Sequence, residues 1–449
     1  MSSNIEIEKK QICILGLGHV GLTLAVVMAE RGFNVIGFDT NSNLINKVNK
    51  KKSPILEPNI EDYLERSLGK TFHATTDLDN VTADVYIITV GTPIDPKTKI
   101  PNIEYIISAS KTIGDKIKKG DLVILRSTVP IGLSRNIVAP ILEERSGLVC
   151  GNDFLLSYSP ERTIEGEALK ELGELPQIVS GYDSMSCKMS SEIFSKITND
   201  VIDVGSLESA EMVKIMNNTF RDVKFAYANE MALICKDLGL DMVELVKSAN
   251  AGYKRDRIPV PSPGVGGACL SKDSYILRYS TKNIEHKPNI VSLARDTNEL
   301  IPHEIMKSLK YELDITNKEI ETSKFFIVGF AFKGDPETAD LRGSTTIDFL
   351  NELRKTSGNK NLVYGYDPII ASEDIEQLDI KFVDYEEGFK NADVVMFMNN
   401  HKSYSSLNIE EMLNRASPDC IFFDGWHLFE PSLIKSTKQI KYHGVGCKF

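Results

Sequence analysis

One cysteine of this chain stands in a setting that could support covalent chemistry. Cys269 lies in the glycine-rich stretch Gly264–Asp273, and Lys272 and Asp273 follow it within one helical turn. A thiolate assisted by a neighbouring cation and carboxylate can act as a nucleophile and capture an aldehyde. Most free cysteines are instead small buried side chains, and this segment taken alone slightly favours that plainer interpretation. The other six cysteines lie in strand-like or helical runs without such neighbours, and we expect them to be buried.

Two pairs of polar side chains have the spacing that places residues on one helix face. Lys214 and Asn218 are four residues apart in a run with a helical period. The ammonium could stabilise an oxyanion, and the amide could bind a water or a hydroxyl. Glu161 and Glu165 would share a face if Pro160 begins a helical turn, and could then act as bases or bind sugar hydroxyls. The plainer alternatives are a surface pair and an ordinary acidic first turn.

A glycine pattern near the N-terminus predicts a dinucleotide site. Gly16, Gly18 and Gly21 form G-x-G-x-x-G between a predicted strand and a predicted helix, and Asp39 ends the next strand. The glycines allow a tight turn and close approach to a pyrophosphate at the helix N-terminus, while the acid would bind the ribose hydroxyls. Because a carboxylate would repel a 2′-phosphate, Asp39 favours NAD over NADP.

Two further strand ends carry small polar residues. Thr92 in V-G-T-P and Thr128 in S-T-V-P each follow an apolar strand. In open α/β sheets ligands bind outside the carboxyl ends of the strands, so these hydroxyls could contact a cofactor or a water. Alternatively, the prolines only end the strands, and the residues alone favour neither interpretation.

The order of the elements predicts an α/β protein. Apolar, β-rich runs alternate with helical patterns in the first third and again from Lys324, as in doubly wound parallel sheets. Between them, 206–249 predicts one long helix or two joined near Gly239, and 258–267 predicts an irregular loop. The predicted strands cover 11–15, 34–38, 84–90, 121–125, 325–330, 361–366, 380–383, 393–398 and 420–423.

We therefore expect two Rossmann-like doubly wound domains joined by a long central helix and a helical middle domain. The expected boundaries are 1–205 for a cofactor-binding domain, 206–315 for a helical dimerisation domain that holds the cysteine loop, and 316–449 for a second α/β domain.

The composition is that of a soluble globular chain. It has 449 residues, of which 42% are hydrophobic and 26% charged, and a net charge of −11. The acidic balance argues against binding to nucleic acid or to an anionic membrane, because affinity for phosphates comes from Lys and Arg. Seven cysteines without a C-x-x-C pair predict no zinc ribbon and no disulfide framework, so we expect no metal and a reducing, cytoplasmic setting. Met1–Lys10 has no signal-peptide core, and no apolar run approaches the roughly 20 residues of a membrane span.

Taken together, the motifs resemble the UDP-glucose/GDP-mannose dehydrogenase family. The family order is G-x-G-x-x-G, V-G-T-P, S-T-V-P, P-E-R, E-M-V-K-x-x-x-N, G-V-G-G-x-C-x-x-K-D and G-x-A-F-K, and this chain follows it from Gln11 to Trp426. The resemblance outweighs the plainer interpretation of each segment. It implies that C6 of a nucleotide sugar is oxidised from alcohol to aldehyde to acid, with two NAD per substrate.

The resemblance also implies a role for each matching residue. Cys269 would be the nucleophile that holds the aldehyde as a thiohemiacetal and then as a thioester, which water hydrolyses. Lys214 would stabilise the oxyanion, and Asn218 would place the hydroxyl and the water. Ordering of the water and proton handling would fall to Thr128, Glu161 and Asp273.

Cofactor and substrate contacts are implied in the same way. Arg342 would reach the cofactor side, and Lys333 would contact the substrate. The resemblance also implies a homodimer formed through the central helix. In this dimer Arg257, or alternatively Arg255, would contact the substrate of the neighbouring subunit. The implied cofactor residues are Gly16, Gly18, Val20, Gly21, Asp39, Thr92, Thr128, Glu165, Lys272 and Arg342. The implied substrate residues are Glu161, Arg162, Lys214, Asn218, Arg255, Arg257, Gly266 and Lys333.

The motifs differ in the sugar that they indicate. Glu161-Arg162 and the string Glu174–Gln177 resemble the UDP-N-acetylhexosamine branch, whereas Lys272-Asp273 after the cysteine resembles the UDP-glucose branch. Ala268 before the cysteine departs from the His that is usual in the N-acetyl branch. We favour UDP-N-acetylmannosamine or UDP-N-acetylglucosamine and keep UDP-glucose as the alternative.

Two remoter alternatives remain at this stage. A β-hydroxyacid dehydrogenase also joins a Rossmann domain to a long helix through Lys and Asn, but it has no use for a nucleophilic cysteine or a C-terminal α/β domain. A non-catalytic nucleotide-sugar binder would tolerate loss of Cys269, Lys214 or Asn218, and all three are present.

Overall fold

The computed structural model describes residues 10–79, 81–358, 362–437 and 440–447. Residues 1–9, which carry most of the Met1–Lys10 expectation, and Asn361 of the strand predicted over 361–366 lie outside this part of the chain. The chain forms two compact units. Unit 1 comprises Met1–Asn217 and Tyr275–Lys287, and unit 2 comprises Asn218–Ser274 and Pro288–Phe449. The three-part division at 1–205, 206–315 and 316–449 stays a proposal.

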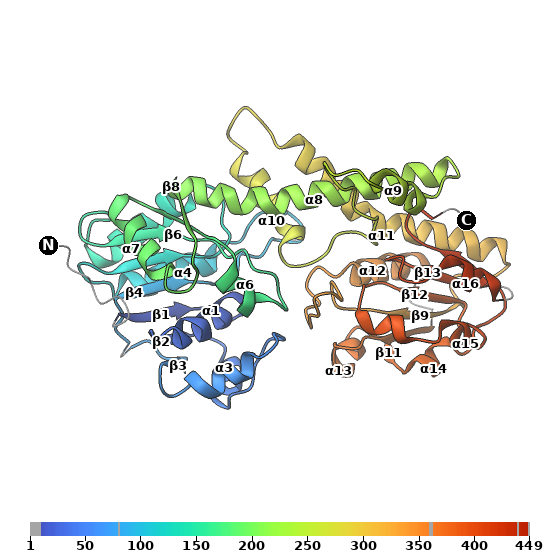
Figure 1. The fold of residues 1–449 in the computed structure, drawn as a ribbon, viewed down its shortest axis with the longest axis horizontal. Coiled ribbons are helices and arrows are strands. Elements are labelled where there is room, and N and C mark those ends of the chain that lie inside the picture. Colours follow the sequence, from blue (N-terminus) through green and yellow to red (C-terminus); the bar gives the residue numbers. More distant parts are fainter. Residues whose placement is uncertain (1–9, 80, 359–361, 438–439, 448–449) are drawn as a thin grey trace. The chain divides into compact units, whose positions relative to one another are not determined.

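Unit 1 is built on an eight-stranded sheet with the order β3-β2-β1-β4-β5-β6-β7-β8 (Figure 1). Neighbouring strands are parallel, except that β6 and β7 are antiparallel. The strands are β1 (Gln11–Leu15), β2 (Asn34–Phe38), β3 (Phe72–Thr75), β4 (Val85–Ile88), β5 (Leu122–Leu125), β6 (Leu155–Tyr158), β7 (Gln177–Gly181) and β8 (Val201–Ser206). Its helices are α1 (His19–Glu30), α2 (Ser42–Asn49), α3 (Ile60–Ser67), α4 (Glu104–Gly114), α5 (Ala139–Ser146), α6 (Ala168–Glu174) and α7 (Ser184–Phe194), with a short π-helix at Ser134–Val138.

Unit 2 contains a six-stranded, fully parallel sheet with the order β11-β10-β9-β12-β13-β14. The strands are β9 (Lys324–Val328), β10 (Leu362–Tyr366), β11 (Lys381–Phe382), β12 (Val394–Phe397), β13 (Cys420–Asp424) and β14 (Ile440–His443). Its helices include α9 (Met242–Asn250), α11 (Asn289–Ile315), α12 (Thr345–Ser357), α13 (Ser372–Glu376), α14 (Tyr385–Phe389), α15 (Ile409–Leu413) and α16 (Pro431–Ser436), with a 3₁₀ turn at Lys402–Ser406. Both sheets have the first strand of their block at the centre, which is the doubly wound order expected from the sequence.

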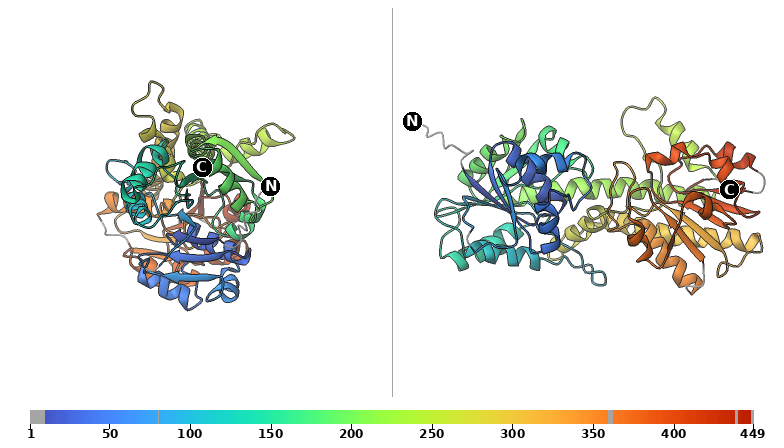
Figure 2. Two further views of the ribbon diagram at one scale, coloured as in Figure 1. Left: turned by 90° about the vertical axis from the view of Figure 1, so that its left-hand side faces the viewer. Right: turned by 90° about the horizontal axis from the view of Figure 1, so that it is seen from below.

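Each central strand is buried on both faces, as a parallel sheet requires. In β1, Ile12 and Ile14 pack into one core with α1, α3 and α7, while Cys13 and Leu15 pack into another with α4 and α5. In β9 the same alternation divides its residues between a core that includes α11 and α12 and a core that includes α14 and α15. Figure 2 shows helices on both sides of each sheet.

Two helices carry residues of both units. Helix α8 runs from Leu207 to Asp237, and α10 runs from Leu270 to Ser280. The chain leaves α8 through Gly239, whose φ of +68° suits the left-handed conformation that ends helices, and α9 begins beyond it. Of the two sequence-based alternatives for 206–249, the pair of helices is therefore the correct one.

Candidate active site

The turn between β1 and α1 is arranged around glycine and an acid, as G-x-G-x-x-G predicts. Gly16 has φ of +97°, and its N–H donates to the Phe38 carbonyl at 2.8 Å. One oxygen of Asp39 accepts the Leu17 N–H at 2.8 Å, and the other accepts the Asn41 N–H at 2.8 Å. A cavity of about 360 Å³ opens here, lined by Leu15, Gly16, Gly18, Phe38, Asp39, Thr40, Thr89, Val90, Gly91, Tyr105, Ser108, Ala109 and Thr112. Of the predicted cofactor residues, Gly16, Gly18 and Asp39 thus line this cavity.

The glycines of this turn have two different reasons to be glycine. A Cβ on Gly21 would lie 1.8 Å from the Gly16 carbonyl oxygen, so this glycine allows helix and strand to pack. A Cβ on Gly18 would meet nothing within 4 Å. Gly18 therefore leaves open space at the N-terminus of α1, where a ligand phosphate would be received. Val20 lies half-buried in the first turn of the same helix.

The two threonines predicted at strand ends follow adjacent strands, β4 and β5. The hydroxyl of Ser127 donates to the Val90 carbonyl at 2.6 Å, which joins the two segments. Thr92 is 4% exposed, and its Oγ1 has no hydrogen-bond partner among the described residues. A buried hydroxyl without a partner fits a site that a bound group completes. Thr128, the residue after Ser127 in the loop that follows β5, is half-buried.

Glu161 does not lie in a helical turn, so that expectation is wrong. Its Oε1 accepts the N–H groups of Arg162 and Thr163 at 2.6 and 2.9 Å, and these bonds hold an irregular loop in place of a helix. Its Oε2 lies 2.6 Å from a guanidinium nitrogen of the buried Arg126. Burial opposes ionisation of Glu161, but Arg126, the Thr163 N–H and the Lys214 ammonium hold the pKa of this carboxyl below its ordinary value. Arg162 donates to the Pro176 carbonyl at 3.2 Å.

Glu165 belongs to the same loop but faces the glycine turn. One of its oxygens lies 4.0 Å from Nδ1 of His19, the first residue of α1. The loop is held by Glu57, which accepts the Gly166 N–H at 2.8 Å and the Leu169 N–H at 3.1 Å. Glu57 had no distinguishing pattern in the sequence, because its partners lie more than a hundred residues away.

Lys214 is buried on α8, and the acid Glu211 on the same helix binds the loop that follows β5. Glu211, one turn earlier, accepts the Ser134 N–H at 3.0 Å and also the Gly132 N–H. Burial raises the pKa of Glu211 to about 7 against the opposing effect of these bonds. Glu211 therefore ties the helix that carries Lys214 to the loop that follows Thr128, a link that sequence reasoning missed.

In unit 2, Cys269 is the exposed cysteine and the other six cysteines of the chain are buried. It immediately precedes α10, whose N-terminus favours negative charge. One turn into this helix Asp273 is 1% exposed and accepts from the side chain of Asn218 at 2.6 Å. Lys272 lies 3.2 Å from the same carboxylate. Unit 2 thus brings together four of the predicted residues.

The glycines before Cys269 fit against the segment after β9. A Cβ on Gly266 would lie 2.3 Å from the Gly343 carbonyl oxygen, to which the Gly267 N–H donates at 3.0 Å. This contact, within unit 2, seats the cysteine loop on the segment that carries Lys333 and Arg342. Arg342 is 64% exposed and forms a two-pronged ion pair with Asp340, at 2.9 and 2.6 Å.

Arg255 and Arg257 are both exposed. They lie in a loop whose ends are joined by reciprocal hydrogen bonds between the Asn250 side chain and the Ile258 backbone, at 2.9 and 3.0 Å. Arg255 also lies over the Tyr253 ring, 5.7 Å from its centroid. Both arginines are therefore exposed on the same loop.

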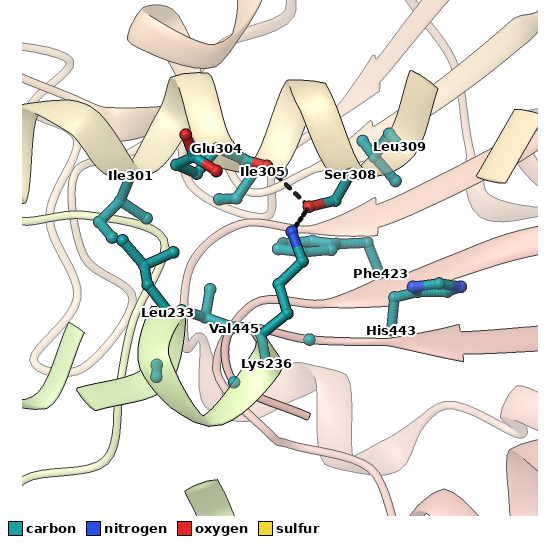
Figure 3. Close-up of a pocket in the computed structure, with 13 residues that line it drawn as sticks. Leu233, Lys236, Ile301, Glu304, Ile305, Ser308, Leu309, Phe423, His443 and Val445 are labelled. Atoms are coloured by element: carbon teal, nitrogen blue, oxygen red, sulfur yellow. Dashed lines mark hydrogen bonds between the residues drawn. The ribbon is translucent and has the colours of Figure 1, made fainter. Parts of the chain in front are cut away.

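Unit 2 contains a cavity of its own, which lies between the end of α8, α11, and the end of β14 with the residues after it (Figure 3). Lys236 reaches across it and donates to the Ser308 hydroxyl, and burial lowers the pKa of Lys236. Its volume is about 30 Å³, which holds very few water molecules. This cavity is too small for a nucleotide and contains no predicted site residue.

Comparison with known proteins accounts for nearly the whole chain. Models of the UDP-glucose/GDP-mannose dehydrogenase family match at residues 10–198 (NAD binding domain), 208–300 (central domain) and 326–431 (UDP binding domain). A UDP-N-acetyl-D-mannosamine dehydrogenase of Campylobacter jejuni is 31% identical over 90% of this chain and 98% of its own length. The chain belongs to the UDP-glucose/GDP-mannose dehydrogenase family.

Solved structures agree with this assignment. The UDP-D-ManNAc dehydrogenase of Pyrococcus horikoshii superposes with a TM-score of 0.87 at 30% identity, covering 97% of this chain and 99% of its own. An NDP-N-acetyl-D-galactosaminuronic acid dehydrogenase of Methanosarcina mazei gives 0.81 at 28% identity, covering 100% of this chain and 98% of its own. As a family member the chain is an NAD-dependent oxidoreductase of nucleotide sugars, with an NAD-binding and a UDP-binding domain. The sequence-based prediction of family and fold is confirmed.

The two glycines of the NAD-binding turn make a matched pair of test positions. Gly21→Ala should destabilise the protein by about 3 kcal/mol, because its Cβ would collide with backbone. Gly18→Ala should leave the melting temperature unchanged, since Gly18 has φ of −70° and open space beside it. Gly18→Ala should still lower the affinity for NAD by about tenfold, because the methyl group would occupy the phosphate position.

Calorimetry of melting and of NAD binding on both variants checks this prediction. Equal stability of the two variants would contradict the packing role of Gly21, and unchanged NAD affinity in Gly18→Ala would contradict the phosphate assignment.

Proposed function

We propose that the protein is a UDP-N-acetylhexosamine 6-dehydrogenase that oxidises a C6 alcohol to the uronic acid in two steps. The observation that carries the proposal is the setting of Cys269, which is exposed at the N-terminus of α10, one turn before the hydrogen-bonded pair Asp273–Asn218. A two-electron β-hydroxyacid dehydrogenase needs no such thiol, and a non-catalytic binder needs none of these groups.

The first step removes a hydride from C6 and a proton from its hydroxyl group, which leaves an aldehyde. When bound, NAD supplies the hydride acceptor for each oxidation, so that two NAD are used per substrate. The fit of the site to NAD rests on the Asp39 carboxylate, the open position at Gly18 and the unpartnered hydroxyl of Thr92. We also assign Thr128, Glu165, Lys272 and Arg342 to cofactor contacts.

The second step is covalent. The sulfur of Cys269 adds to the aldehyde carbon to give a thiohemiacetal, which loses a hydride from carbon and a proton from its hydroxyl group to become a thioester. Water then attacks the thioester carbon, the C–S bond breaks, and the products are the acid and the free thiol. The ammonium of Lys214 stabilises the oxyanion of each addition. Asn218 and Asp273 place the attacking water, a role supported by their 2.6 Å hydrogen bond.

The substrate contacts extend to the remaining predicted residues. We assign the nucleotide to the UDP-binding domain with Lys333, and the sugar to Glu161, Arg162 and the loop at Gly266. The N-acetyl group is favoured because the named relatives of Campylobacter jejuni and Pyrococcus horikoshii are UDP-N-acetyl-D-mannosamine dehydrogenases. UDP-glucose remains the alternative, since Lys272-Asp273 matches that branch. The proposed chemistry uses no metal.

We further propose a homodimer formed through α8. Phe220, Tyr227 and Ile234 are spaced by seven residues on one helix face and are 63%, 50% and 44% exposed. Such a stripe of large apolar side chains indicates an interface. The exposed loop with Arg255 and Arg257 would then serve the substrate of the neighbouring subunit.

Two further expectations concern the setting of the protein. No described helix has the length and apolarity to cross a bilayer. The seven cysteines are free, which supports a reducing, cytoplasmic location that cell fractionation would test.

Reaction stoichiometry tests the proposed function. With limiting UDP-N-acetylmannosamine, NADH yield per substrate should approach two, and EDTA should not lower it. UDP-N-acetylglucosamine, UDP-N-acetylgalactosamine and UDP-glucose complete the panel. A yield of one on every substrate would contradict the covalent second step, and turnover of UDP-glucose alone would assign the other branch.

Replacement of the nucleophile tests the role of Cys269. Cys269→Ser should lower acid formation by about 10³-fold or more, because serine is a far weaker nucleophile here. Binding of the UDP-sugar should persist in calorimetry. The matched change Cys150→Ser, at a buried cysteine, should leave turnover near that of the wild type. Undiminished acid formation by Cys269→Ser would exclude the thioester.

Charge on the apolar stripe tests the dimer. Phe220→Asp combined with Ile234→Asp should convert a dimer into monomers by light scattering, because two carboxylates would be buried in the interface. Met185→Asp on α7, which is 54% exposed in the wild type, is the control and should stay dimeric. A wild type that is monomeric at micromolar concentration would refute the proposed dimer.

A further inference from the structure

The side chain of Arg295, on α11, binds the backbone on both sides of Cys269. It is 1% exposed. Its Nη2 donates to the Val265 carbonyl at 3.2 Å, and its Nη1 donates to the Leu270 carbonyl at 3.1 Å. Val265 precedes the exposed cysteine and Leu270 follows it directly. One planar, rigid group therefore fixes the chain before and after the thiol.

The buried carboxylate of Asp222, on α8, holds this guanidinium. Oδ1 of Asp222 lies 3.3 Å from Nη1 of Arg295 and accepts from the Asn298 side chain at 2.8 Å. Oδ2 accepts the hydroxyl of Ser274, on α10, at 2.9 Å. Burial raises the pKa of Asp222, and the charge of Arg295 and these two hydrogen bonds oppose this effect. Removal of Arg295 alone would therefore leave a buried carboxylate without its countercharge.

Two buried asparagines extend the contacts to the beginning of the loop. The Asn229 side chain accepts the Ser262 N–H at 2.9 Å and donates to Oδ1 of Asn298 at 2.9 Å. Asn298 in turn donates to Asp222, as described above. All of these residues belong to unit 2. The backbone from Ser262 to Leu270 is thus bound at three points to side chains of α8 and α11.

The composition of the loop explains why such contacts are needed. Gly264 and Gly267 have φ of +101° and +93°, and Gly266 lies between them. Glycine gives the backbone a freedom that must be removed before a side chain can be placed accurately. A displacement of about 1 Å at a reacting group can cost about 100-fold in rate. A buried group that binds the backbone of this loop therefore bears directly on the accuracy of the thiol.

We propose that Arg295 is a positioning residue that fixes the Cys269 thiol for its attack on the aldehyde carbon, with Asp222 holding the guanidinium in place. The proposal rests on the proposed function for the role of Cys269. Its consequence is a difference between the two oxidations, because the thiol takes part only in the second.

The first test compares two reactions of one aldehyde in Arg295→Met/Asp222→Asn, which removes both charges of the buried pair. The probe is the 6-aldehyde of the UDP-sugar that the wild type prefers. With NAD, kcat for oxidation to the acid should fall by about 100-fold, because this reaction needs the thiol. With NADH, kcat for reduction to the alcohol should stay within about threefold of the wild type, as should both KM values. A general loss of structure would lower both rates together.

A conservative variant and a matched control accompany this test. Arg295→Lys keeps a cation beside Asp222 and a donor for one carbonyl, so it should lose only about tenfold in aldehyde oxidation and nothing in reduction. It also tests the proposal if the double variant does not fold. The control is Arg354→Met, which removes a guanidinium of α12 that donates to the Leu378 carbonyl. This control should change neither rate.

The second test does not depend on turnover. In native-state hydrogen exchange, the backbone amides of residues 264–272 should exchange about tenfold faster or more in Arg295→Met/Asp222→Asn than in the wild type. The amides of α12 should be unaffected. Arg354→Met should show wild-type exchange over 264–272.

Each outcome decides the proposal. Equal changes in oxidation and reduction, or unchanged exchange over 264–272, would overturn it even if the wild type makes two NADH per substrate. A wild type without activity on the substrate panel would refute the proposed function, while hydrogen exchange would still decide whether Arg295 fixes the cysteine loop.

Discussion

Carboxylates that accept backbone N–H groups hold the loops of this enzyme in place. Asp39 binds the glycine turn, and Glu57 binds the loop that carries Glu165. Glu211 binds the loop after Thr128, and Glu161 binds the backbone of the two residues that follow it. An ionised acceptor makes such bonds short and strong, but only if its burial is compensated. The irregular segments at the strand ends can thus be rigid without secondary structure of their own, as the positioning of reacting groups requires.

In both sheets an aspartate binds the backbone of the turn that follows the first strand. Asp39 follows the second strand of one sheet, and Asp367 follows β10, the second strand of the other. Asp367 accepts the N–H groups of Phe330 and Ala331 in the turn after β9, just as Asp39 accepts that of Leu17. Asp367 also receives the N–H groups of Ile369 and Ile370 and is 4% exposed, whereas Asp39 lines a cavity. The same arrangement therefore borders a cavity in the first sheet and is buried in the second.

Local patterns predicted much of the fold and part of the site. The spacing of apolar residues predicted the central strands of both sheets, and G-x-G-x-x-G predicted the turn. The segment around Cys269 taken alone slightly favoured a buried thiol, and only the family resemblance singled out Cys269, which is the exposed one. The contributions of Arg126 and Glu211 could not be seen, because their partners are 35 and 77 residues away and no periodicity records such contacts. The helical turn expected at Pro160 failed for the same reason, since a distant guanidinium fixes Glu161 outside a helix.

The burial of six thiols and the exposure of one predict which sulfur of this enzyme is oxidised first. Peroxide attacks accessible sulfur first, and a sulfenic acid on Cys269 would still be recoverable by cellular reductants, whereas a sulfinic acid would not. Under the proposed mechanism, this damage would leave a correctly folded, nucleotide-binding but inert population. Quality control that recognises unfolding would leave these molecules in the cell, where they would compete with active enzyme for its substrate.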